Sequence, residues 1–365
     1  MSSKKDNFTS QDKKFMQLAL KLASVRKGLT GENPSVGCLI VKNDRIISIG
    51  QTGFNGRPHA EKNAIDSSFQ NLKGSKMYVS LEPCNHYGKT PPCTNIIIDK
   101  KISRLVFGAH DIDKRSSKRA KQILKSKKIK VKNINVPKIN EFYKPYIFQR
   151  KYKQPYVVGK IACSKDFFIK SSKSKYISNT YTQSFSHHLR YKNQAILVTY
   201  KTINEDNPLL DCRLSGLNGY SPIKVIIDKN LKVKKNANIF KSKNTKIIIL
   251  YNSGDKKKIK FLKSKKAKLI NVKLEKNGEF DLKKVMSILY KNNIRFLLVE
   301  GGNQLTNKML DKNLFNEFYL IKTDNKLRQS GKLNIKKIVY KLSKKFKIKS
   351  NINQYFDKNR ITRFN

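Results

Sequence analysis

Short apolar runs bounded by polar and turn residues alternate along most of this chain with segments of helical periodicity. In the first part, residues 38–50 form a hairpin-like run, and 76–83, 104–111 and 129–136 have the composition of buried strands. The basic segment 115–128 has the pattern of a helix. Strands that alternate with helices predict an α/β domain, in which helices cover a sheet.

The pattern restarts after residues 145–155, where the strand-like segment 154–166 begins. We therefore predict two domains, 1–148 and 149–365, and 365 residues suffice for each to bury its own core. In the second part, strands are predicted at 195–203, 223–229, 245–252 and 294–302, and helices at 183–194, 281–293 and 303–312.

Composition adds a formal net charge of +54 to this picture. Such a balance ordinarily suggests a polyanionic partner, because Lys and Arg neutralise nucleic-acid phosphates. The excess is mostly Lys, spread over the whole chain together with many Asn and Ile, which are the residues of A- and T-rich codons. The basic segments 255–268 and 336–349 lack the interleaved aromatics of a single-strand binder. We therefore expect no specific nucleic-acid partner, although the charge would attract phosphorylated small substrates.

The polar N-terminus and the lack of any apolar run of bilayer length predict a cytoplasmic protein that binds no membrane. Beyond the two cysteines considered next, Cys38, Cys163 and Cys212 form an odd remainder. They indicate no disulfide framework.

The strongest chemical signal is His59-Ala60-Glu61, followed by Pro83-Cys84 and Pro92-Cys93. An imidazole and two thiolates are ligands that suit Zn²⁺, and three protein ligands leave the fourth position for a water whose pKa the metal lowers. Glu61 would then move protons from that water to the leaving group. A purely structural zinc site normally has four protein ligands, and His86 is the only further Cys or His in this stretch.

The spacing and the flanking residues refine this prediction. Nucleic-acid and nucleoside deaminases usually have two residues between their cysteines, whereas eight residues separate Cys84 from Cys93. His59 and Cys93 each follow Pro and precede a segment of helical pattern, which predicts that both ligands stand at helix starts. The positive ends of those helices would favour thiolate.

The string EPCNHYGKTPPC at 82–93 resembles the deaminase half of the bifunctional riboflavin-biosynthesis deaminase/reductases, and NPSVG at 33–37 resembles the same family's upstream segment. The resemblance implies a cytidine-deaminase-like α/β/α domain. It also implies that Asn33 contacts the pyrimidine and that His86 and Thr90 contact substrate. Lys89 stands where the family usually has Arg.

The second half resembles that family's dihydrofolate-reductase-like domain in the segments HLR at 188–190, DNP at 206–208 and EGG at 300–302. A strand that ends in EGG before a helix exposes backbone amides that can receive phosphate. By the resemblance, NADPH would be bound by Ala162, Tyr176, Thr202, Asp206, Gly301 and Gly302, and the substrate by Ser174, Arg190, Leu210, Arg213 and Glu300. In this role Arg190 and Arg213 would hold the substrate phosphate.

Several positions depart from the family. Phe167 replaces a glycine, Tyr176 replaces a tryptophan, Thr199 and Lys201 replace glycines before Thr202, and residues 111–113 read DID in place of DPN. Most of the losses fall in the reductase half.

The resemblance implies a homo-oligomeric enzyme with Zn²⁺ and NADPH. It would deaminate 2,5-diamino-6-(5-phosphoribosylamino)pyrimidin-4-one and then reduce the ribosyl group to ribityl. Two alternatives stay open at this point. One is a nucleic-acid base deaminase, and the other is a deaminase whose second domain has become structural.

Overall fold

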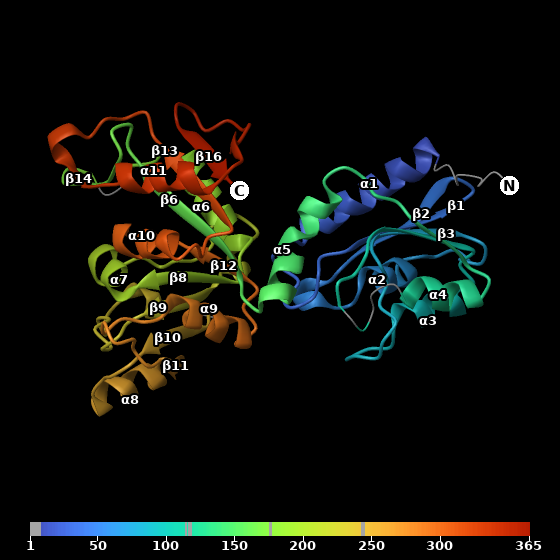
Figure 1. The fold of residues 1–365 in the computed structure, drawn as a ribbon, viewed down its shortest axis with the longest axis horizontal. Coiled ribbons are helices and arrows are strands. Elements are labelled where there is room, and N and C mark those ends of the chain that lie inside the picture. Colours follow the sequence, from blue (N-terminus) through green and yellow to red (C-terminus); the bar gives the residue numbers. More distant parts are fainter. Residues whose placement is uncertain (1–8, 114, 116–118, 175–176, 242–244) are drawn as a thin grey trace. The chain divides into compact units, whose positions relative to one another are not determined.

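The computed structural model describes residues 9–113, 115, 119–174, 177–241 and 245–365, and the chain forms two compact units, Met1–Lys153 and Gln154–Asn365 (Figure 1). Position 148, where the sequence suggested the domain boundary, lies inside the last helix of the first unit. Each unit is described by itself below.

The first unit contains helices and strands in alternation. They are α1 (Ser10–Val25), β1 (Gly37–Lys42), β2 (Arg45–Gln51), the 3-10 turn η1 (Phe54–Gly56), α2 (Ala60–Asp66), β3 (Lys76–Leu81), α3 (Cys93–Asp99), β4 (Arg104–Ala109), α4 (Arg119–Ser126), β5 (Lys130–Asn133) and α5 (Ile139–Tyr152).

Its described strands form one sheet in the order β2-β1-β3-β4-β5. The hairpin β1–β2 and the pair β1–β3 are antiparallel, while β3, β4 and β5 run parallel. Helices α1 and α5 cover one face, and α2, α3 and α4 cover the other (Figure 1). The α/β/α architecture expected for this half is confirmed.

Two glycines allow the helices to lie directly on the sheet. A Cβ at Gly37 would stand 2.0 Å from the carbonyl oxygen of Ala19 in α1, and one at Gly50 would stand 2.3 Å from that of Ala60 in α2. Close backbone contact therefore sets the position of α2, the helix that follows His59.

The second unit is larger. Its elements are β6 (Tyr156–Cys163), β7 (Phe168–Ser171), α6 (Thr180–Tyr191), β8 (Ala195–Thr199), α7 (Tyr200–Asp206), η2 (Asn218–Tyr220), β9 (Ile223–Ile227), η3 (Asn238–Phe240), β10 (Ile247–Tyr251), α8 (Lys256–Ser264), β11 (Ala267–Asn271), α9 (Leu282–Lys291), β12 (Phe296–Val299), α10 (Asn303–Asp311), β13 (Glu317–Lys322), η4 (Arg328–Ser330), β14 (Gly331–Asn334), α11 (Lys336–Lys345), β15 (Lys349–Asn351) and β16 (Arg360–Phe364).

The main sheet of this unit has the order β11-β10-β9-β8-β12-β6-β13-β16-β15, and β7 pairs separately with β14. All neighbours from β11 to β13 are parallel, so the carboxyl ends of β8, β9, β12 and β6 meet at one edge. Loops at this edge are where ligands bind in open α/β sheets.

One predicted strand was too long. Residues 195–203 were expected to be a single strand, but β8 ends at Thr199 and α7 begins at Tyr200. The Thr199 side chain accepts a hydrogen bond from the Thr202 amide and so caps the helix. Helix α1, which we did not predict, begins with a capping box between Thr9 and Asp12.

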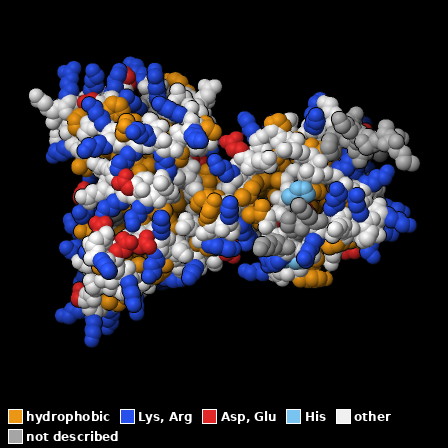
Figure 2. Space-filling model, in the orientation of Figure 1, with side chains coloured by type: hydrophobic (Ala, Val, Ile, Leu, Met, Phe, Trp, Pro, Cys, Tyr) orange, Lys and Arg blue, Asp and Glu red, His pale blue; other side chains and the backbone are white. Residues whose placement is uncertain are grey.

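Charge is distributed over the surface rather than gathered in one place. Figure 2 shows Lys and Arg side chains across the visible face of both units. Within the part of the chain that the structure describes, no helix combines the length and apolarity needed to span a bilayer.

Candidate active sites in the two units

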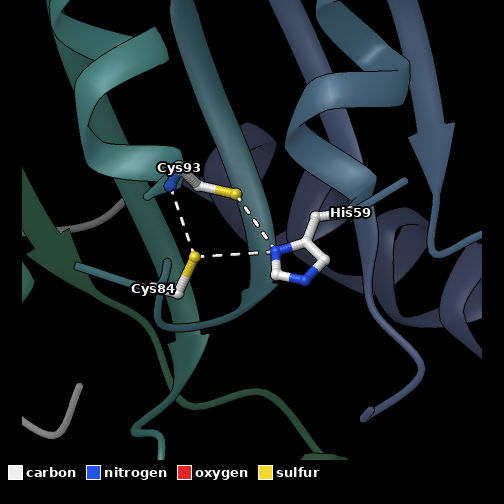
Figure 3. Close-up of side chains that lie close together, drawn as sticks. All are labelled: His59, Cys84 and Cys93. Atoms are coloured by element: carbon white, nitrogen blue, oxygen red, sulfur yellow. Dashed lines mark hydrogen bonds between the residues drawn. The ribbon is translucent and has the colours of Figure 1, made fainter. Parts of the chain in front are cut away.

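Three residues from different elements converge at the edge of the first sheet. His59 is the N-cap of α2, Cys84 follows β3, and Cys93 is the first residue of α3 (Figure 3). The His59 Nδ1 atom lies 3.3 Å from the Cys93 Sγ atom and 3.6 Å from the Cys84 Sγ atom. The Cys93 amide also donates to the Cys84 Sγ atom at 3.3 Å, as expected for a thiolate at a helix start.

The three side chains of the cluster shift one another's pKa. A hydrogen bond from the Cys93 side chain lowers the pKa of Cys84 to about 4, and the same contact raises the pKa of Cys93. The hydrogen bond with Cys84 raises the pKa of His59. Metal binding would require Cys93 to lose its proton and His59 to be neutral, so it would release protons from this cluster.

The donor set fits Zn²⁺. Tetrahedral zinc with bonds of about 2.3 Å to sulfur and about 2.0 Å to nitrogen places its ligand atoms roughly 3.5 Å apart. The ligand atoms of His59, Cys84 and Cys93 all lie within 4.8 Å of one another, and Nδ1 is the ring nitrogen that faces both sulfurs. Three protein ligands leave a fourth coordination position.

Glu61, the second residue of α2, lies beside the three ligands. Its side chain is only 4% exposed, and burial raises its pKa to about 7. A carboxyl group with this pKa can both accept and donate a proton near neutral pH.

A cavity of about 480 Å³ opens beside these groups. It is lined by the predicted substrate residues Asn33, His86 and Thr90 together with His59, Glu61 and Cys84. The structure thus brings all of the site residues predicted for the first domain together, with Cys93 buried next to the cavity.

The rest of the cavity wall carries acidic groups that motif reasoning did not assign. Glu82 is buried and lies 3.0 Å from the His110 Nδ1 atom. Asp111 accepts a hydrogen bond from the Tyr146 hydroxyl at 3.0 Å, and burial raises its pKa. These groups can accept hydrogen bonds from the amino and hydroxyl groups of a ligand.

The second unit holds a larger cavity, of about 800 Å³, at the carboxyl edge of its parallel strands. The predicted residues that line it are Ala162, Thr202, Asp206, Glu300, Gly301 and Gly302. Gly302 caps α10, and no atom lies within 4 Å of a Cβ built on it, so a phosphate could approach the backbone there.

Glu300 is held by two cations. Arg190 donates to both of its carboxylate oxygens, from Nε at 3.0 Å and from Nη2 at 2.9 Å, and the Lys160 Nζ atom lies 3.9 Å away. Burial by itself raises the pKa of Glu300, but the two positive charges outweigh it and lower the pKa to about 2. Arg190 therefore binds Glu300 through Nε and Nη2. Its third nitrogen, Nη1, donates to the Asp211 carbonyl oxygen at 3.2 Å.

Other predicted residues lie around rather than in this cavity. Leu210 is 4% exposed, and the Arg213 Nε atom pairs with Asp211 at 3.3 Å. Ser174 is exposed after β7, and Tyr176 falls outside the described residues.

The residues that stand where the family has glycine lie in a turn and at a helix start. Phe167 has a φ of 70°, the left-handed conformation for which glycine is favoured, and its ring packs against the Lys322 ammonium at 4.2 Å. Lys201 lies in α7 and lines the cavity. This chain therefore forms a left-handed turn at Phe167 and the start of α7 without glycine at these positions.

Comparison with known proteins assigns a family model to each unit. Residues 9–109 match the model of the cytidine and deoxycytidylate deaminase zinc-binding region, and residues 155–322 match that of the RibD C-terminal domain. The chain is 32% identical over 311 residues to riboflavin biosynthesis protein RibD of Aquifex aeolicus, covering 83% of this chain and 84% of that protein. The corresponding protein of Chlamydia pneumoniae is 31% identical over 320 residues, with 86% and 85% covered.

The chain belongs to the RibD family. RibD proteins serve riboflavin biosynthesis, and this member is an enzyme with a zinc-dependent deaminase domain and an NADPH-dependent reductase domain. A solved Thermotoga maritima structure, described as a diaminohydroxyphosphoribosylaminopyrimidine deaminase/5-amino-6-(5-phosphoribosylamino)uracil reductase, is 26% identical with a TM-score of 0.78, covering 97% of this chain and 98% of that one. RibD of Acinetobacter baumannii has the same fold, with a TM-score of 0.80.

Sequence reasoning missed several charged residues of this RibD chain. Lys160 approaches Glu300, Lys170 pairs with Asp206 at 2.9 Å, and Arg57 lines the deaminase cavity. Lys160 and Lys170 lie on strands whose partners come from distant segments, and Arg57 lies in an irregular turn. A lysine-rich chain offers no compositional signal that would single them out.

Proposed function

We propose that the first unit converts 2,5-diamino-6-(5-phosphoribosylamino)pyrimidin-4-one and water into 5-amino-6-(5-phosphoribosylamino)uracil and ammonia. The second unit then reduces the ribosyl group, in its opened imine form, to ribityl. The observation that carries the proposal is the convergence of His59, Cys84, Cys93 and Glu61 beside one cavity, in a chain of the RibD family.

In the first unit, His59, Cys84 and Cys93 would hold zinc, which when bound lowers the pKa of the attacking water. The buried Glu61 accepts a proton from that water and delivers it to the ring nitrogen. It then transfers a second proton, taken from the hydroxyl group that the water has added, to the departing amine. Asn33, whose side chain is held by a 2.9 Å hydrogen bond from Nδ2 to the Gly56 carbonyl oxygen, presents its amide oxygen to the pyrimidine.

In the second unit, NADPH would supply the hydride. Thr202, Asp206, Gly301 and Gly302 would bind this cofactor, and Ala162 would lie against it. The ionised Glu300, aligned by Arg190, would accept hydrogen bonds from sugar hydroxyls. Arg213, which pairs with Asp211 beside the cavity, would provide positive charge for the phosphate.

The direct test is mass spectrometry of the diaminopyrimidine phosphate after incubation with the zinc-loaded protein, with and without NADPH. We expect exchange of an amino group for oxygen in both samples and the addition of two hydrogens only with NADPH. Deamination without reduction would mean that the second unit no longer catalyses, and an unchanged substrate would contradict the proposal for both units.

A pair of variants separates metal binding from proton transfer. Glu61→Gln keeps His59, Cys84 and Cys93, so we expect full zinc content but a loss of deamination by about 10²–10⁴-fold. Cys84→Ser removes a ligand and is expected to lose both zinc and activity. Zinc content by atomic absorption and turnover are measured on the same samples of both variants. Normal turnover by Glu61→Gln would exclude proton transfer by Glu61.

We also infer that the protein is a cytoplasmic homo-oligomer that acts on small molecules and binds no specific nucleic acid. Light scattering of the purified protein tests the oligomeric state. Tight binding to single-stranded RNA or DNA that persists at physiological salt would contradict the inference that the protein binds no specific nucleic acid.

A further inference from the structure

Among the described residues, four Lys and Arg side chains line the deaminase cavity, and they differ in how they are paired. Arg115 is held by Asp113 through Nη2 at 2.7 Å and Nε at 3.0 Å, and Arg150 lies over the Tyr146 ring and donates to the Glu32 carbonyl oxygen at 3.4 Å. Lys89 is exposed on the loop between the two cysteines. Among the described residues, Arg57 contacts no carboxylate.

Contacts of the backbone before Arg57 and of its side chain determine where Arg57 lies. It follows η1, whose last residue, Gly56, accepts the hydrogen bond from Asn33. Its Nη1 donates to the Thr90 hydroxyl, and its Nη2 lies 3.7 Å from where a Cβ of Gly88 would stand. The guanidinium therefore lies against the loop that connects Cys84 to Cys93.

This arrangement leaves most of the guanidinium available to a ligand. Arg has five N–H donors in a planar fork, and the contact with Thr90 uses one of them. An unpaired guanidinium in a cavity is suited to a bidentate grip on phosphate. The carboxylates Glu82 and Asp111 in the same cavity would repel a phosphate and favour the amino and hydroxyl groups of the ligand instead.

We propose that Arg57 binds the 5′-phosphate of the deaminase substrate and thereby selects the phosphorylated riboside over the dephosphorylated one. This inference rests on the proposed deamination. Arg57 is in this sense a specificity residue, and its contact with Thr90 orients the guanidinium toward the cavity.

The test compares the phosphorylated substrate with its dephosphorylated riboside in the zinc-loaded full-length protein. For Arg57→Met we expect KM for the phosphorylated substrate to rise about 10–100-fold with kcat within about 3-fold, and kcat/KM for the riboside to stay within about 2-fold. Arg57→Lys should restore part of the preference, because it keeps the charge and loses the fork.

The matched control is Lys62→Met, which removes one positive charge from α2 outside the cavity, where Lys62 pairs with Asp66. It should leave both substrates unaffected. An equal loss on both substrates in Arg57→Met would show that Arg57 only positions the loop, and unchanged kinetics would show that it has no role; either result overturns the proposal.

A binding measurement keeps the inference independent of turnover. In calorimetric titrations of the zinc-loaded protein with ribose 5-phosphate, Arg57→Met should weaken one class of sites at least 10-fold, while Lys62→Met matches the parent protein. If Arg57→Met binds ribose 5-phosphate more weakly than the parent protein but the parent protein does not deaminate its substrate, the proposed reaction fails and the phosphate site stands. Identical titrations for Arg57→Met and the parent protein would refute the phosphate site.

Discussion

Glu300 and Arg190 lie 110 positions apart in the chain, and they meet as a bidentate pair inside the reductase unit. Both side chains are nearly buried, with exposed fractions of 12% and 13%. A buried carboxylate without a partner would be strongly destabilising. Glu300 can therefore be ionised inside the unit only because Arg190 pairs with it. Lys160, whose pKa burial lowers, adds a second positive charge.

This pair predicts a pH dependence of stability. The folded-state pKa of Glu300 is about 2, below its ordinary value of 4.5, so the ionised form stabilises the fold above about pH 4.5 and this contribution is lost as the pH falls toward 2. The difference corresponds to about 3 kcal/mol. Urea unfolding of the parent protein and of Glu300→Gln should therefore differ most at pH 7 and clearly less at pH 3. Glu275→Gln, at a half-exposed ion pair, serves as the control and should show little difference at either pH.

Phe167 illustrates how a single position can tolerate an unfavourable residue. Its φ of 70° costs a non-glycine residue about 1–2 kcal/mol, which contact of the ring with the core and with Lys322 offsets. We expect Phe167→Gly to change the free energy of unfolding by less than about 2 kcal/mol and to retain NADPH binding. Fluorescence titration with NADPH checks this, and lost binding in a folded variant would show that the ring itself serves the cofactor site.

At the scale of elements, the deaminase site depends on how closely α2 approaches the sheet. Gly50 on β2 lies under α2, and the Ser48 hydroxyl on the same strand donates to the Ala64 carbonyl oxygen of the helix. His59 caps this helix and Glu61 lies in its first turn, so the zinc ligand and the proposed proton carrier move with it.

Gly50→Ala should therefore weaken zinc binding although Gly50 does not contact the zinc ligands. Its Cβ would stand 2.3 Å from the Ala60 carbonyl oxygen and 2.4 Å from the Ala64 amide nitrogen, so α2 must shift. We expect a loss of about 1–3 kcal/mol in stability and at least 10-fold weaker zinc binding. Gly219→Ala is the matched control, because nothing lies within 4 Å of its Cβ. Equal zinc affinity in the two variants would contradict the proposed dependence on α2.

Over the whole molecule, the dominant feature is a formal charge of +54. Like charges at this density repel one another in the compact state, and salt at 0.1 M ionic strength largely screens that repulsion between charges more than about 10 Å apart. We expect the melting temperature to rise by roughly 2–4 °C between 0.05 and 0.5 M NaCl, which corresponds to about 1 kcal/mol. KCl at equal ionic strength should give the same rise in differential scanning calorimetry. A melting temperature that falls with salt would mean that surface ion pairs, rather than repulsion, dominate.

The sequence by itself determined many of the local elements, although not α1 or α5, and the ligand chemistry of the first site. Strand and helix segments follow from periodicity, which depends on neighbouring residues only, and the ligand types of His59, Cys84 and Cys93 with the adjacent Glu61 follow from the motif. The strand predicted at residues 195–203 was too long for a local reason. Thr199 follows an apolar run, and β-branched Thr is common in strands, so the pattern alone did not reveal that it caps a helix.

Only the tertiary structure decided which side chains meet. The pair of Arg190 with Glu300 depends on β8, β12 and β6 being neighbours in the sheet although they are far apart in the chain. Arg57 faces the cavity because η1 and the loop between the cysteines fold against each other. Such contacts depend on strand order and on close approach of backbones, neither of which local patterns of hydrophobic and polar residues encode.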